Sequence, residues 1–188
     1  MRFFCDAMLG GLARWLRGAG YDASFVHGID DGDLVRRCAE EGRVLLSSDS
    51  GIFLRNVIKD GSVRALFVPR ATPPVDQLAF VLRELGLEPR IGDARCMSCS
   101  GELASVAKTE VAGEVPPRSF EAFDEFWRCV TCAKVYWHGT HWASIRSKVD
   151  QKNVDPRPAA MPRSPNAIPS TNTSSTRDGN TNERPPPT

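Results

Sequence analysis

Apolar residues in the first ninety positions alternate between short unbroken runs and sets with helical spacing. Four short runs, at residues 2–5, 23–26, 44–46 and 65–68, predict buried strands. Between and after them, apolar residues recur every three or four positions, as Leu9, Leu12 and Leu16 do, and predict amphipathic helices. Because strands and helices alternate, the pattern predicts an α/β fold with a parallel sheet and helices on both faces.

The segment from residue 96 to residue 142 has a different pattern. It is short, rich in cysteine and aromatic residues, and contains no long periodic run. We therefore expect a small second module at residues 93–148, after an α/β core at residues 1–92.

The last segment, residues 149–188, is polar and rich in proline. From residue 151 onward there is no aromatic residue, and eight of the fourteen prolines lie there. Such a segment cannot bury enough apolar surface to offset the entropy that it loses on ordering. We therefore expect a disordered tail.

The charge of the chain argues against a protein that relies on a large basic excess. The formal net charge of the chain is +1. The five basic and three acidic residues after position 150 give that segment a charge of +2, which leaves −1 for the rest. Any binding of nucleic acid must therefore come from a local basic patch. No apolar run approaches the roughly 18–20 residues needed to span a bilayer. The N-terminus is a poor signal peptide, so we expect a cytoplasmic protein with no membrane partner.

Four of the six cysteines form two C-x-x-C pairs separated by 29 residues. The two-residue spacing lets both thiolates of a pair bind one tetrahedral ion, and two pairs complete a shell with no place for water. Such a closed shell is typical of structural zinc, whereas two disulfides, a redox pair or an iron–sulfur site are the alternatives. We expect one structural zinc ion on Cys96, Cys99, Cys129 and Cys132.

Two histidines lie just beyond the second cysteine pair. His138 and His141 are either competing zinc ligands or surface residues beside Trp137 and Trp142. The second interpretation is favoured because four thiolates already satisfy the ion.

Four aspartates fall near the carboxyl ends of the predicted strands. Asp6 follows the first strand, Asp49 follows the third, and Asp31 and Asp33 lie in the first turn of the helix after the second. Ligands of an open parallel sheet bind beyond these strand ends. Carboxylates there suit Mg²⁺ or Mn²⁺, which can activate water and hold a phosphodiester. Alternatively, Asp31 and Asp33 cap the helix and Asp49 is a turn residue.

Three arginines are expected near the same strand ends. Arg14 and Arg17 lie one turn apart on the first helix, and Arg70 follows the fourth strand. Guanidinium groups match the geometry of phosphate, so these residues are candidates for holding a nucleic-acid backbone. The alternative is that each belongs to an ordinary solvated face.

Several long motifs resemble one known family. Residues 3–17 read FFCDAMLGGLARWLR and are followed by Gly20-Tyr21-Asp22; residues 42–49, both cysteine pairs and residues 135–142 also fit. Together they resemble the family named for the C-terminal RNase region of the Mut-seven exonuclease. The resemblance implies a PIN-like nuclease fold with a zinc ribbon, and a ribonuclease that uses Mg²⁺ or Mn²⁺ held at Asp6 and Asp49.

The sequence departs from the family pattern in two places. The family usually has Thr-Arg-Asp where Ser47-Ser48-Asp49 stands, so a basic side chain is missing. The acidic position that opens the second helix is filled by either Asp31 or Asp33.

We therefore expect a metal-dependent ribonuclease that acts on single-stranded RNA. Asp6, Asp49 and one of Asp31 or Asp33 would serve catalysis. A basic and aromatic surface would hold the strand, with tryptophan stacking on an unpaired base. The alternatives are a non-catalytic RNA-binding or adaptor protein that uses the zinc ribbon, and a toxin of a toxin–antitoxin pair. The residues of that surface are Arg14, Arg17, Arg70, Trp137, His138, His141 and Trp142.

Overall fold

The computed structural model describes residues 1–137 and residue 147. The predictions for His138, His141, Trp142 and the tail at residues 149–188 lie outside the described residues. Within the part that is described, no helix is both long and apolar enough to cross a membrane.

The first sheet contains four parallel strands, as the apolar pattern predicted. They run in the order β2-β1-β3-β4, with every neighbouring pair parallel. The carboxyl ends of all four strands therefore meet at one edge of the sheet. The strands are β1 (Arg2–Cys5), β2 (Asp22–Phe25), β3 (Val44–Ser47) and β4 (Ala65–Phe67).

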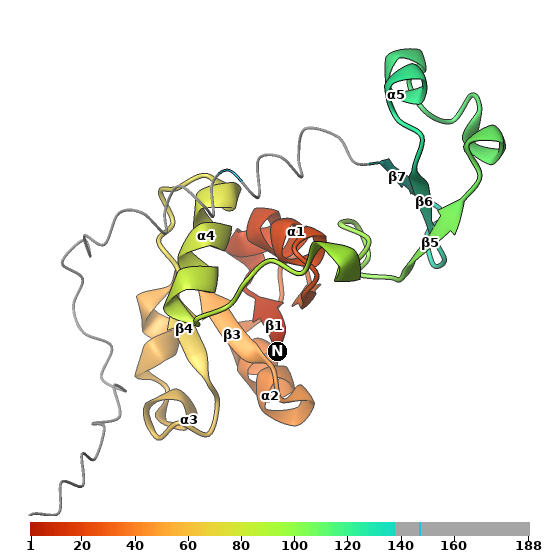
Figure 1. Cartoon of the computed structure of the whole chain (residues 1–188). Helices are drawn as coiled ribbons and strands as arrows, with labels where there is room; N and C mark the ends of the chain where they lie inside the picture. The colour runs from red at the N-terminus through yellow and green to blue at the C-terminus, as the bar shows by residue number, and fades with distance from the viewer. Residues whose placement is uncertain (138–146, 148–188) are drawn as a thin grey trace, which may run out of the picture.

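Helices cover both faces of this sheet (Figure 1). Successive residues of a strand point to opposite faces, so Phe3 packs with α1 (Gly10–Gly18) and α4 (Pro74–Glu84). Its neighbour Phe4 packs with α2 (Asp31–Glu41) on the other side. The predicted flanking helices are thus confirmed. After β3 the chain forms a 3-10 turn, η2 (Ser50–Leu54), followed by the short α3 (Asn56–Lys59). Another 3-10 turn, η1 (Ala7–Leu9), precedes α1.

The second sheet is small and antiparallel, in the order β5-β6-β7. Its own core consists of Val111, Val115 and Phe126, and Trp137 packs against that core half-buried. The boundary between residues 92 and 93 stays a prediction. The elements of this part are η3 (Ile91–Asp93), β5 (Leu103–Val106), η4 (Lys108–Val111), α5 (Pro117–Ala122), β6 (Phe126–Cys129) and β7 (Val135–Trp137).

Candidate functional site

The four cysteines of the two pairs converge at one point. All four sulfurs lie within 4.8 Å of one another, with 3.6 Å between Cys96 and Cys132 and 3.4 Å between Cys99 and Cys129. A tetrahedral zinc ion with bonds of about 2.3 Å would set its sulfurs about 3.8 Å apart. All of these cysteines are free thiols rather than disulfides. The cluster is therefore compatible with a zinc site.

Each cysteine pair forms the same tight turn. The amide of the second cysteine donates to the sulfur of the first, over 3.4 Å in one pair and 3.5 Å in the other. The residue after each pair has a positive φ, 66° at Ser100 and 59° at Ala133, so the two turns share their backbone form. Burial raises the pKa of Cys96, but the hydroxyl of Tyr136, 3.1 Å away, and nearby amides outweigh burial and lower the pKa to about 6. At Cys96 the turn thus favours the thiolate, which is the form that binds metal. A backbone amide lowers the pKa of Cys99, but burial and the neighbouring thiols outweigh it and raise that pKa to about 12.

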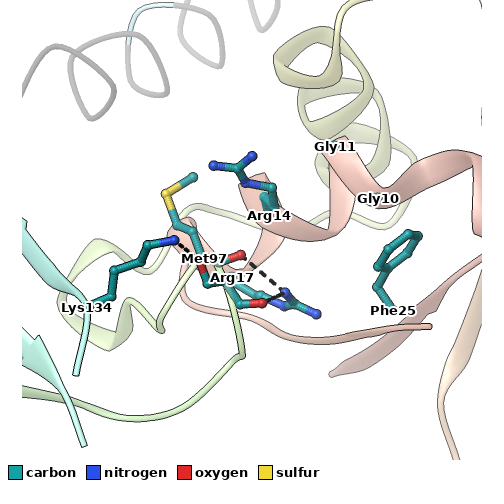
Figure 2. Close-up of a pocket in the computed structure, with 8 residues that line it drawn as sticks. Gly10, Gly11, Arg14, Arg17, Phe25, Met97 and Lys134 are labelled. Carbon is teal, nitrogen blue, oxygen red and sulfur yellow. Dashed lines mark hydrogen bonds between the residues drawn. The ribbon is translucent and has the colours of Figure 1, made fainter. Parts of the chain in front are cut away.

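Arg17 lies underneath the first cysteine pair. Its Nε donates to the carbonyl of Ala23 over 2.7 Å, and its Nη1 donates to the carbonyls of Met97 (3.2 Å) and Ser98 (3.0 Å). The residue is only 6 % exposed. The expectation that Arg17 holds RNA therefore needs correction, because burial and backbone carbonyls occupy its guanidinium. Arg17 instead joins α1 and β2 to the cysteine pair (Figure 2).

Asp6 is held at the carboxyl end of β1. It is 5 % exposed, one carboxylate oxygen accepts the amide of Ala7, and the other accepts the hydroxyl of Ser47 over 2.6 Å. The hydroxyl oxygen of Ser47 also accepts the amide of Asp49 over 3.0 Å. Ser47 thus links Asp6 to Asp49. Ser47 was not among the candidate site residues, although a hydroxyl at the end of an otherwise apolar strand indicates a polar contact there.

The structure distinguishes Asp31 from Asp33. Burial raises the pKa of Asp31, and the negative charges of Asp6 and Asp49 raise it further, so Asp31 lies close enough to both carboxylates to interact with their charges. Asp33 instead pairs with Arg36 at 3.0 Å, and its side chain is 60 % exposed. Asp31 therefore fits the acidic position better than Asp33. We call Asp6, Asp31 and Asp49 the acidic edge.

A basic residue does lie near the acidic edge, at a position that the sequence analysis did not consider. Arg55 precedes α3, and its positive charge opposes the rise in the pKa of Asp31. Ser48, where the family usually has arginine, donates its hydroxyl to the carbonyl of Val68 over 2.7 Å. No local pattern singled out Arg55, because only the folded chain brings it close to α2.

The acidic edge does not form a closed cage of ligand atoms. Among residues 1–137, only the cysteine cluster brings three or more candidate ligand atoms within 4.8 Å of one another. Mg²⁺ usually keeps several waters and binds through one or two carboxylates, so its binding does not require such a cage.

The remaining predicted RNA contacts are spread out. Arg14 is exposed on α1, and Arg70 is exposed after β4. Trp137 is half-buried against the small core of the second sheet, so only part of its ring is available for stacking.

Comparison with known proteins identifies the family. A model of the Mut7-C RNAse domain matches residues 1–149. The chain belongs to this family. Membership indicates a nuclease-type function, with RNA as the implied substrate class.

Two curated relatives are cysteine–tRNA ligases. The ligase of Cupriavidus pinatubonensis (strain JMP 134 / LMG 1197) is 38 % identical over 78 residues, which are 38 % of this chain and 17 % of the ligase. That of Laribacter hongkongensis (strain HLHK9) is 33 % identical over 107 residues, 54 % of this chain and 22 % of the ligase. The chain thus spans about a fifth of the length of these relatives. No solved structure matches.

Proposed function

We propose that this member of the Mut7-C family is a ribonuclease with a PIN-like core that uses Mg²⁺ or Mn²⁺ at the acidic edge. The observation that carries the proposal is the link through Ser47, which joins the carboxylate of Asp6 to the backbone amide of Asp49, with Asp31 close enough for the charges of both to raise its pKa. A bound cation would offset the negative charge that gathers there.

The residues of the acidic edge have different roles in this proposal. Asp6 and Asp49 would hold the ion, and Asp31, whose pKa their charges raise, would add a third carboxylate beside it. A divalent ion at this place lowers the pKa of bound water and stabilises charge on the leaving oxygen. Arg55 offsets the negative charge nearby and can hold a phosphate of the substrate.

The four cysteines hold one structural zinc ion in this proposal. Their closed shell has no position for water, so this metal folds the second module and takes no part in hydrolysis. The buried Arg17 supports the same role, since it fixes the first cysteine pair to α1.

The second candidate function is a non-catalytic RNA-binding or adaptor protein. It is favoured because, among residues 1–137, no three carboxylates lie close enough together to enclose an ion, and because serine occupies position 48. Because the curated relatives are named for charging tRNA, tRNA is a suitable first substrate beside unstructured RNA.

A cleavage assay tests the proposal. Labelled single-stranded RNA and tRNA are incubated with zinc-loaded protein and Mn²⁺. We expect the wild type to cleave, Asp6→Asn to lose cleavage, and the matched control Asp33→Asn to retain it. Equal cleavage by the wild type and Asp6→Asn would refute the role of Asp6. RNA binding without cleavage, and without a Mn²⁺ site that Asp49→Ala removes, would favour the adaptor.

A further inference from the structure

A groove of about 420 Å³ lies between α1 and the first cysteine pair (Figure 2). Its volume is within the range of roughly 300–1,000 Å³ that is usual for small-molecule sites. The lining includes three basic side chains, one of which (Arg17) is already bonded to backbone carbonyls, with a phenyl ring, a thioether and no acidic residue. The lining residues are Gly10, Gly11, Arg14, Arg17, Phe25, Met97, Ser98 and Lys134.

Phe25, which lines the groove, lies at the same end of the sheet as the acidic edge. Phe25 is the last residue of β2 and pairs in parallel register with Cys5, the residue before Asp6. The phenyl ring therefore stands at the same end of the sheet as the proposed metal site. A strand whose phosphodiester reached Asp6 would place a neighbouring nucleotide close to this ring.

The start of α1 is shaped for the ring of Phe25. A Cβ at Gly10 would lie 2.7 Å from the Phe25 ring, so only glycine lets the ring lie this close to the helix. The ring is half-buried, and the half-buried Met97 lines the same groove from the cysteine turn. Aromatic rings and thioethers give bases an apolar surface without selecting a sequence.

The cations lie on both walls. Arg14 is exposed on α1, and the exposed Lys134 stands on the cysteine side, where its Nζ donates to the neutral hydroxyl of Ser98 over 2.8 Å. A hydroxyl does not neutralise the lysine, so its charge remains available to an anion. An apolar surface flanked by two cations is complementary to one nucleotide. The base would pack against the apolar surface, and the phosphate would lie at the opening of the groove beside the cations.

We propose that this groove binds one unpaired nucleotide of an RNA strand. The base packs against Phe25 and Met97, and its phosphate lies between Arg14 and Lys134. The assignment rests on the proposed ribonuclease function, and it adds a binding site that the cysteine turn completes.

The binding test separates this site from catalysis. Affinity of zinc-loaded full-length protein for a short fluorescein-labelled RNA is measured by anisotropy in the Asp6→Asn background, so that cleavage does not interfere. Met97→Ala and Phe25→Leu should each weaken binding about fivefold or more. Lys134→Gln should weaken binding and reduce the slope of log affinity against log salt by about 0.7, the value for one single-strand phosphate contact. The control Arg118→Gln, an exposed residue on α5, should change neither quantity.

A second readout uses the unaltered groove. RNA that carries 4-thiouridine is cross-linked to the Asp6→Asn protein, and the modified peptides are mapped by mass spectrometry. Cross-links at Phe25 or Met97 support the site even if a variant fails to fold. The nucleotide site would be overturned if cross-links formed only at other residues, or if all three groove variants bound RNA as tightly as the unaltered groove. Either result would leave the ribonuclease proposal intact. Absence of both RNA binding and cleavage in the wild type would overturn both.

Discussion

The hydroxyl of Ser47 donates a 2.6 Å hydrogen bond to the carboxylate of Asp6. Ser47 ends β3 and Asp6 follows β1, so the bond crosses two adjacent parallel strands at their carboxyl ends. Both residues are buried, and water therefore competes little for the bond. The same hydroxyl also accepts the backbone amide of Asp49, so one side chain joins the carboxylate of Asp6 to the main chain at Asp49.

Replacing Ser47 by alanine should impair both stability and metal binding. The variant leaves a buried oxygen of Asp6 without its donor, which should lower the free energy of unfolding by about 1–3 kcal/mol. It also frees the carboxylate of Asp6 to reorient and releases the backbone amide of Asp49, so the Mn²⁺ affinity should fall. Urea unfolding and Mn²⁺ titration measure the two effects.

Ser48→Ala is the matched control for Ser47→Ala. Its hydroxyl donates to the carbonyl of Val68 and to none of the carboxylates of the acidic edge. Its loss should reduce stability and leave the Mn²⁺ affinity unchanged. Equal losses of Mn²⁺ affinity in the two variants would contradict a specific role for Ser47.

Asp31 should make stability depend on pH in the absence of divalent ions. Burial and the charges of Asp6 and Asp49 raise its pKa in the folded protein, so the folded state holds a proton that the unfolded state releases first. The free energy of unfolding should therefore fall as pH rises from the ordinary aspartate pKa through the raised one. Asp31→Asn should remove this fall and be more stable than the wild type near neutral pH, by urea unfolding.

The advantage of Asp31→Asn should disappear in two conditions. Below the ordinary aspartate pKa both proteins carry a neutral side chain, so their stabilities should converge. Saturating Mn²⁺ should stabilise the wild type more than the variant. Asp33→Asn, which removes an exposed partner of Arg36 from the first turn of α2, should instead be slightly less stable at neutral pH. A wild type that gains stability as pH rises through this range would contradict the account.

Local sequence patterns predicted most of the parallel sheet. Apolar runs and helical periodicity depend on neighbouring residues, and the strands at residues 2–5 and 44–46 follow from them directly. A carboxylate after an apolar strand also made Asp6 and Asp49 candidates, since parallel strands bring their carboxyl ends together; their role at a metal site stays a prediction.

The positions of the basic residues around the acidic edge could not be predicted from local sequence patterns. Arg14 and Arg17 look alike in sequence, but one is exposed and the other is buried beneath Met97 and Ser98, some eighty positions away. Arg55 reaches Asp31 only because η2 and α3 turn the chain back towards α2. Such contacts depend on tertiary packing, which periodicity does not encode.

The buried arginine gives a test of how the two modules are joined. Arg17→Leu leaves the carbonyls of Ala23, Met97 and Ser98 without their donor, and should cost about 1–3 kcal/mol of stability. Release of zinc to a chromogenic chelator should also become faster, because the first cysteine pair loses its attachment to α1.

Two variants control the Arg17 experiment. Arg14→Leu changes an exposed arginine of the same helix and should leave stability and zinc release nearly unchanged. Arg17→Lys keeps the charge but lacks the planar guanidinium whose several N–H donors contact β2 and the cysteine turn at once. It should therefore not restore the slow zinc release of the wild type. Full rescue by lysine would show that only the charge of Arg17 matters.

Removal of zinc should loosen the second sheet and spare the first. The antiparallel strands have a core of only three fully buried apolar residues, and Cys129, at the end of β6, ties them to the metal cluster. The parallel sheet has separate and larger cores on both faces. After chelation, amide hydrogen exchange should therefore accelerate strongly at Phe126–Cys129 and little at Arg2–Cys5. Cys38→Ala, outside the cluster, should keep zinc and the normal pattern. Equal loss of protection in both strands would instead mean that the chain unfolds as one unit, and that no domain boundary lies at residues 92 and 93.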